Sequence, residues 1–161
     1  MSSRNISAAD VLQRLRAANC TLCTAESCTG GLLGKLLTDV PGASSVYVGG
    51  VISYTNDVKH RLLGVSRQTL ERHTAVSAET AGEMARGARA RLGADVAVSV
   101  TGLAGPDGDG TGRPVGLVYI ALDRAVGCLV QELHLAGDRA AIREQAAQAV
   151  FALILETLSE P

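Results

Sequence analysis

Short apolar runs alternate with helical patterns along the N-terminal part of the chain. The apolar runs near residues 20–24, 45–54 and 95–100 predict strands, and amphipathic segments lie between them. Alternation of this kind is typical of βαβ units, in which the strands are parallel and the helices cover the sheet. Two more apolar runs, at 115–123 and 128–135, follow each other without a helix and predict antiparallel neighbours. The pattern predicts an α/β fold: a single layered domain with a mixed, partly parallel sheet flanked by helices.

Small polar residues that cap helix N-termini precede most of the helical patterns, and glycines follow several of them. The expected helices are 7–18, 29–37, 55–63, 77–91 and 138–159, with a helical turn at 68–73. If the residues before the second helix form an ordinary strand-to-helix turn, Ser27 or Thr29 is the expected N-cap of that helix. In the last helix Val150, Leu153 and Ile154 belong to an apolar face. On a small domain that has few aromatic residues, such a face predicts a homodimer that covers it.

Composition and charge narrow the class of protein. The chain has 161 residues, of which 47% are hydrophobic and 19% charged, so residues 1–161 are expected to form one domain with a substantial core. Three tyrosines and one phenylalanine provide few stacking platforms for nucleic acid, and a net charge of −1 attracts neither nucleic acid nor an acidic membrane. There is no signal-peptide pattern and no apolar run of membrane length, which predicts a cytoplasmic protein.

The segment Thr24-Ala25-Glu26-Ser27-Cys28-Thr29-Gly30-Gly31 joins the first expected strand to the second expected helix. It concentrates hydroxyl, thiol and carboxylate groups next to two glycines, which allow a ligand to approach the backbone. The N-terminus of a helix also carries unpaired N–H groups and a partial positive charge, which favour anions and nucleophiles. An ordinary strand-to-helix turn has the same pattern, so this segment alone does not separate the two interpretations.

Two other polar segments follow strands in the same way. In an open α/β sheet, ligands bind beyond the carboxyl ends of the strands, so residues 26–31, 55–59 and 101–112 are expected to meet at one edge. Ser27 is a candidate nucleophile there. Lys59 is a candidate base, because burial and the positive end of a helix both lower the pKa of a lysine. A surface lysine or a phosphate anchor is the alternative for Lys59. The glycine-rich loop at 101–112 offers backbone amides to an oxyanion or a phosphate, unless it is a plain surface loop.

The cysteines and histidines do not predict a metal site. Cys20 and Cys23 have the spacing of a redox pair, but in a strand their side chains point to opposite faces. No second cysteine pair or nearby histidine completes a zinc site, and His60, His73 and His134 are poorly placed to serve Ser27 as a base. We therefore expect neither a metal nor a cofactor.

Several separate motifs, in this order, resemble the CinA C-terminal domain family, and together they extend over nearly the whole chain. They are AESCTGG at 25–31, VISYTNDVK at 51–59, HTAVS at 73–77, TGLAGPDG at 101–108, RPVG at 113–116 and GDR at 137–139. The resemblance implies a Ser/Lys amidohydrolase that needs no metal. The resemblance to the stand-alone members of the family implies deamidation of nicotinamide mononucleotide to nicotinate mononucleotide and ammonia. The expected partner is therefore the small-molecule substrate, nicotinamide mononucleotide.

The resemblance also implies the roles of individual residues. Ser27 is the expected nucleophile, Lys59 the base and Tyr54 a supporting hydroxyl. The substrate-binding residues that we expect are Thr29, Gly30, Gly31, Ser44, Asn56, Thr101, Gly102, Gly105, Arg113 and Arg139. Among them, the loops of Gly30 or Gly105 are expected to hold the oxyanion. Arg113, Arg139 or a helix N-terminus is expected to bind the substrate phosphate.

Ser44 also matches a family serine and is the alternative nucleophile. It precedes the strand that Lys59 follows, and a straight strand of about ten residues spans about 30 Å. This separation favours Ser27, although a bend at Gly49-Gly50 or a second subunit would bring Ser44 closer.

Two further alternatives concern the chemistry itself. A non-catalytic nucleotide-binding or regulatory module is one, because this domain also occurs fused to others in the family. The set of Ser27, Tyr54 and Lys59 favours an enzyme, since a binding module needs no such set. Cys28 is an alternative nucleophile, which the adjacent Ser27 makes less favoured.

Overall fold

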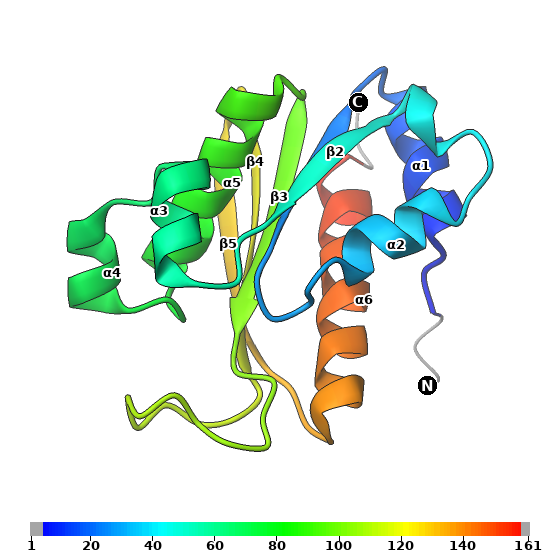
Figure 1. Ribbon diagram of the computed structural model, residues 1–161. Helices are drawn as coiled ribbons and strands as arrows, with labels where there is room; N and C mark the ends of the chain where they lie inside the picture. The colour runs from blue at the N-terminus through cyan, green and yellow to red at the C-terminus, as the bar shows by residue number, and fades with distance from the viewer. Residues whose placement is uncertain (1–4, 159–161) are drawn as a thin grey trace.

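The computed structural model describes residues 5–158 and shows a central sheet with helices on both faces (Figure 1). The elements are α1 (Ala8–Ala17), β1 (Leu22–Glu26), α2 (Leu32–Thr38), the 3-10 turn η1 (Ala43–Ser45), β2 (Tyr47–Ile52), α3 (Asn56–Leu63), α4 (Arg67–His73), α5 (Ala78–Leu92), β3 (Val96–Gly102), β4 (Leu117–Arg124), β5 (Gly127–His134) and α6 (Arg139–Thr157). This architecture confirms the predicted α/β class.

The five strands form one mixed sheet in the order β2-β1-β3-β4-β5. Strand β1 is parallel to both β2 and β3, whereas β4 is antiparallel to β3 and β5 is antiparallel to β4. The carboxyl ends of the three parallel strands therefore lie at the same edge of the sheet. At that edge, Glu26 is paired with Ile52 on one side and Val100 on the other. Residue 27 thus leaves the sheet between β2, which ends at Ile52, and β3, which continues to Gly102.

Two apolar layers hold the helices to the sheet. Helices α1, α2 and α6 pack on one face, where a cluster built mainly from leucine, valine and isoleucine includes Phe151. Helices α3 and α5 pack on the other face through Leu63, Met84 and Ala88. Alanines on this second face let α5 approach the strands closely, as expected for a core with one phenylalanine. The two layers explain how a chain poor in aromatic residues buries its central strands β1, β3 and β4 almost completely.

Local capping sets most helix boundaries. The side chains of Ser7, Thr55, Ser77 and Asp138 each accept a hydrogen bond from a backbone N–H in the first turn of the following helix. The predicted N-cap of the second helix is wrong, because α2 begins at Leu32, beyond both predicted caps, and has no side-chain cap at its N-cap glycine. The predicted end of the last helix at residue 159 lies outside the described residues.

The apolar face of α6 is covered by the chain itself. Val150, Leu153 and Ile154 are at most 3% exposed and belong to the cluster that packs on the sheet. The face was predicted correctly, but the argument that it needs a second subunit is wrong. The sequence shows that a helix has an apolar face and does not show which surface covers it.

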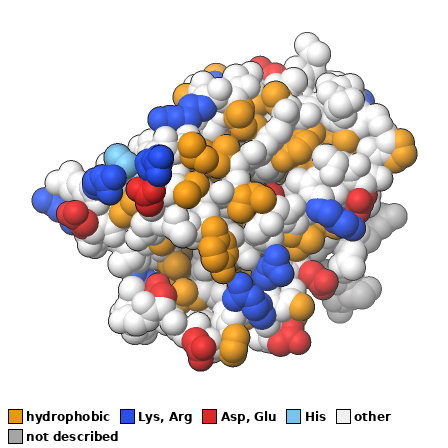
Figure 2. All heavy atoms as spheres, in the orientation of Figure 1, with side chains coloured by type: hydrophobic (Ala, Val, Ile, Leu, Met, Phe, Trp, Pro, Cys, Tyr) orange, Lys and Arg blue, Asp and Glu red, His pale blue; other side chains and the backbone are white. Residues whose placement is uncertain are grey.

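The edge strand β2 has an irregular register and an uncovered side. One extra residue, Val48, interrupts its pairing with β1. A Cβ at Gly50 would lie 2.2 Å from the Thr24 hydroxyl oxygen, so a residue with a side chain does not fit at this position without a shift of its neighbours. Figure 2 shows apolar side chains on the face that carries α2, β2 and α3, and Val48, Ile52 and Leu62 of these elements are about half exposed. Within residues 5–158, none of the helices has both the length and the apolar character needed to cross a membrane.

Candidate active site

Residues 27–31, which we call the nucleophile turn, join β1 to α2. The Ser27 N–H donates to the Val100 carbonyl at 3.0 Å, so the first residue of the turn is still held by the neighbouring strand. The Gly30 N–H then donates to the Ser27 carbonyl at 3.0 Å. Gly30 and Gly31 have φ values of 58° and 105°, and this left-handed conformation lets the chain reverse into α2. The turn leaves Ser27 at the end of the parallel strands.

Lys59 reaches Ser27 from the first turn of α3. Its Nζ lies 2.9 Å from Ser27 Oγ, 2.8 Å from the Ser53 carbonyl oxygen and 3.4 Å from the Tyr54 carbonyl oxygen. The lysine is 1% exposed and has no carboxylate among these partners. The predicted meeting of these two side chains at one edge of the sheet is what the structure shows.

Burial lowers the pKa of Lys59 to about 8, since a charged amine loses its hydration in this position. A substantial fraction of the amine is then neutral near physiological pH. A neutral amine has two N–H donors and one lone pair. The two backbone carbonyls suit the donors, which leaves the lone pair to accept the Ser27 hydroxyl proton. This arrangement is the one that a general base requires.

Glu26 is a buried residue of the site whose role sequence reasoning missed. Its Oε1 accepts hydrogen bonds from the Thr29 hydroxyl at 2.7 Å and the Leu33 N–H at 2.9 Å, and its Oε2 accepts one from the Gly34 N–H at 3.1 Å. Its carboxylate thus takes the place of a conventional cap at the N-terminus of α2. The first free N–H groups of α2 are therefore already bound, so this helix end is not available to a substrate phosphate.

A cavity of about 270 Å³ opens over the Ser27–Lys59 pair. It is lined by Ser27, Cys28, Tyr54, Lys59, Ala75, Val76, Thr101, Gly102, Leu103, Ala104, Gly105, Asp107, Asp109 and Arg139. Its size is close to the lower limit of about 300 Å³ for typical small-molecule sites. The polar segment after each parallel strand contributes to it, as the topology of the sheet predicts.

Arg139, the first residue of α6, connects two walls of this cavity. Its guanidinium donates to the Gly105 carbonyl at 2.8 Å and to the Tyr54 hydroxyl at 3.2 Å. Also in the cavity lining, the Thr101 hydroxyl donates to the Ala75 carbonyl at 2.7 Å. Asp107 and Asp109 also reach the cavity, and the sequence alone did not single them out.

Not all predicted binding residues line the cavity. Thr29, Gly30 and Gly31 belong to the nucleophile turn but lie outside the lining, and the Gly30 N–H is bound within the turn instead of facing a substrate. Ser44 is exposed in η1, before β2 begins, and lines a separate hollow. Strand β2 lies between Ser44 and the segment that reaches the cavity.

Asn56 and Arg113 also lie away from the cavity lining. Asn56 begins α3 and borders another hollow, next to Arg67. Arg113 donates to the Thr74 hydroxyl and, at 3.2 Å, to the His73 carbonyl, so it anchors the glycine-rich loop to the segment before α5. The placement of Arg113 depends on a loop conformation that the spacing of residues does not reveal.

Cys28 is the second nucleophilic side chain in the cavity. Burial raises the pKa of its thiol to about 11, so it is protonated at neutral pH. A protonated thiol is a poor nucleophile, and the base of this site contacts Ser27 instead. The geometry therefore favours Ser27 over Cys28.

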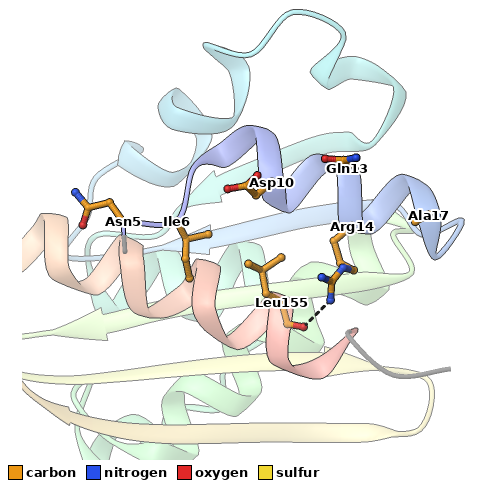
Figure 3. Close-up of a pocket in the computed structure, with 7 residues that line it drawn as sticks. All are labelled: Asn5, Ile6, Asp10, Gln13, Arg14, Ala17 and Leu155. Atoms are coloured by element: carbon orange, nitrogen blue, oxygen red, sulfur yellow. Dashed lines mark hydrogen bonds between the residues drawn. The ribbon is translucent and has the colours of Figure 1, made fainter. Parts of the chain in front are cut away.

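A larger hollow of about 500 Å³ lies between α1 and the C-terminal part of α6 (Figure 3). It is lined by Asn5, Ile6, Asp10, Gln13, Arg14, Ala17 and Leu155, and the Arg14 guanidinium donates to the Leu155 carbonyl at 3.2 Å. Its lining contains no pair of a nucleophile and a base.

Within residues 5–158, no group of three His, Cys, Asp or Glu side chains is arranged to hold a metal ion.

Comparisons of sequence agree on one family. The family model described as the CinA C-terminal domain matches residues 4–158. A CinA-like protein of Geobacter sulfurreducens is 50% identical over 133 residues, which cover 83% of this chain and 32% of that protein. A protein of Acetivibrio thermocellus, named as competence-damage inducible, is 54% identical over 125 residues, with 78% of this chain and 30% of that protein covered. The chain thus spans about a third of the length of these relatives.

Comparisons of structure find the same fold. A competence-damaged protein (CinA) superfamily protein from Escherichia coli has 35% sequence identity and a TM-score of 0.92, with 98% of this chain and 94% of that chain covered. The competence/damage inducible protein CihA from Agrobacterium tumefaciens has 37% identity and a TM-score of 0.88, with 99% and 100% covered. These names state no substrate.

Proposed function

Since the chain belongs to the CinA C-terminal domain family, we propose that it is an amidohydrolase that deamidates nicotinamide mononucleotide. The choice of substrate rests on the resemblance of its motifs to the stand-alone members of that family. The choice of chemistry rests on one observation, the 2.9 Å contact between the Lys59 Nζ and the Ser27 Oγ in a buried site.

The reaction begins when Ser27 Oγ attacks the carboxamide carbon and neutral Lys59 takes the hydroxyl proton. The tetrahedral intermediate collapses as the protonated Lys59 gives this proton to the leaving nitrogen, and ammonia departs. Water then attacks the acyl-enzyme with Lys59 again as the base, which releases nicotinate mononucleotide and restores Ser27. No metal enters any of these steps.

The cavity walls supply the remaining functions. The backbone amides of the loop at Gly105 are the proposed donors to the oxyanion, because this loop lines the cavity and the Gly30 N–H is bound elsewhere. Arg139 brings a fixed positive charge to the cavity and is the proposed partner of the substrate phosphate. Tyr54, held by Arg139, supports the substrate from the same side.

A nucleotide-binding module is the less favoured alternative. A lysine that binds phosphate must keep its charge, whereas burial of Lys59 opposes the charged form. Burying this amine beside a serine costs the folded protein stability. A catalyst gains a neutral base from this arrangement, whereas a binding module gains nothing from it.

Ammonia release from nicotinamide mononucleotide by the purified protein tests the proposal. We expect turnover that chelators do not inhibit, and we expect Ser27→Ala to abolish it. Ser44→Ala is the matched control, since it removes a hydroxyl outside the cavity and is expected to retain turnover. Loss of turnover in Ser44→Ala with retention in Ser27→Ala would show that the nucleophile is misassigned. Activity that disappears in chelator and returns with zinc would refute the Ser/Lys mechanism.

A further inference from the structure

Arg143 contacts the nucleophile turn from α6, although none of the motifs described above includes it. Its Nε donates to the Cys28 carbonyl at 3.0 Å and its Nη2 donates to the Thr29 carbonyl at 2.9 Å. A Cβ placed on Gly30 would lie 3.4 Å from Nη2, so the guanidinium lies directly against the turn. We propose that Arg143 is a positioning residue that sets the direction of the Ser27 hydroxyl; this inference rests on the proposed role of Ser27 as nucleophile.

The turn needs support on the side that Arg143 contacts. On its strand side, the Ser27 N–H is held by the Val100 carbonyl. On its helix side, the carboxylate of Glu26 binds the Thr29 hydroxyl and the start of α2. The peptide groups between these two anchors adopt no repeating structure. Arg143 binds the Cys28 and Thr29 carbonyls, and the Thr29 carbonyl also accepts from the Leu32 N–H at 3.1 Å. A planar guanidinium with N–H groups in a rigid fork restricts both peptide planes at once.

The orientation of these peptide planes matters for the reaction. The Cys28 carbonyl belongs to the peptide group that joins Cys28 to Thr29, one peptide group beyond Ser27. A shift of this group displaces Cys28, and through the preceding peptide bond it displaces the Ser27 backbone and its hydroxyl. Nucleophilic attack requires reacting atoms at near-contact distance, and a misplacement of about 1 Å costs about a hundredfold in rate. Arg143 is therefore expected to preserve the 2.9 Å contact with Lys59 without touching Lys59 or the substrate.

The packing of α6 does not depend on Arg143. The helix is held to the sheet by buried side chains such as Ile142, Ala146 and Val150, whereas Arg143 is only partly buried. Loss of its guanidinium is therefore expected to affect reactivity more than stability. This difference separates a positioning role from a purely structural one.

The test measures how fast Ser27 reacts with a fluorophosphonate, a reagent that needs no recognition of nicotinamide mononucleotide. The Ser27 Oγ–phosphorus bond forms, fluoride leaves, and the hydroxyl proton passes to Lys59. The second-order rate constant is followed by intact mass, the site is confirmed by peptide mapping, and the pH profile is recorded between pH 6.5 and 9.5. Thermal melting of each variant reports stability.

Arg143→Gln is the main variant and Arg16→Gln its matched control. Arg16 likewise binds a loop through two groups, the Gly42 carbonyl at 2.8 Å and the Ser45 hydroxyl at 3.2 Å, but that loop lies away from the cavity. We expect Arg143→Gln to lower the rate constant by about tenfold to a hundredfold. We expect it to keep the wild-type midpoint of the pH profile and to melt no earlier than Arg16→Gln, which should react like wild type.

Arg143→Lys provides a second measurement if the glutamine variant does not fold. A single ammonium holds one carbonyl less rigidly than the fork holds two, so its rate constant should fall between those of wild type and Arg143→Gln. Three results would each overturn the inference. They are a rate constant within twofold of wild type in the folded Arg143 variants, an equal loss of rate in Arg16→Gln, and a shifted midpoint of the pH profile in Arg143→Gln. If wild-type Ser27 itself is not labelled, the proposed function fails, and the inference fails with it.

Discussion

Replacement of Lys59 by methionine tests the buried base through the pH dependence of stability. The folded protein lowers the pKa of Lys59 to about 8, whereas an unfolded chain has the ordinary lysine value of about 10.4. At about 1.4 kcal/mol per pKa unit, the folded state bears a penalty of about 3 kcal/mol below pH 8. Methionine has a similar length and no charge to bury, so Lys59→Met removes this penalty.

The sign of the effect follows from proton binding. Below pH 8 both states bind the proton, and the wild type carries the full penalty. Between pH 8 and about 10.4 only the unfolded state binds it, so wild-type stability rises with pH by up to about 1.4 kcal/mol per unit. Relative to Lys59→Met, the wild type should therefore gain about 2 kcal/mol of unfolding free energy between pH 7 and pH 9.5. Loss of hydrogen bonds to the Ser53 and Tyr54 carbonyls shifts the difference by an amount that does not depend on pH.

Urea unfolding of both proteins at pH 7 and pH 9.5 measures this difference. Lys35→Met is the matched control, because Lys35 is the other of the two lysines and its side chain is 66% exposed. With two lysines in the chain, carbon NMR of labelled lysine also follows Lys59 directly, with an expected midpoint near pH 8. A stability difference that does not change with pH, or a Lys59 midpoint near 10, would refute the argument.

Three further variants probe the same site. Lys59→Arg should keep the fold but lose about a hundredfold or more in ammonia release, because arginine cannot give up its proton; turnover within a few-fold of wild type would make Lys59 an anchor. Cys28→Ala should keep most of the turnover, since the thiol is protonated at neutral pH, and a complete loss would point to Cys28 as the nucleophile. In Glu26→Gln, the side-chain NH2 group replaces one of the two carboxylate oxygens that accept from the α2 N–H groups. We expect the unfolding free energy, measured by chemical denaturation, to fall by about 1–3 kcal/mol. An unchanged stability would contradict this capping role.

The elements and their order were predictable because their signals are local. Ser7, Thr55, Ser77 and Asp138 cap their own helices, so the helix starts follow from neighbouring residues. The meeting of Ser27 and Lys59 was predictable for a more general reason. Residues that follow parallel strands share one edge of the sheet, whatever the details of the loops.

The tertiary structure decided which side chains stabilise the site at this edge and which lie away from it. Glu26 caps α2 across the turn, and Arg143 reaches the same turn from a helix more than a hundred residues later. Ser44 lies before β2, away from the cavity, and Val150 packs inside the chain. Each of these outcomes depends on contacts between segments distant in sequence. Periodicity and capping describe only neighbouring residues, so the sequence alone determined the edge at which the site forms, and the packing of α6 and the loops determined its walls.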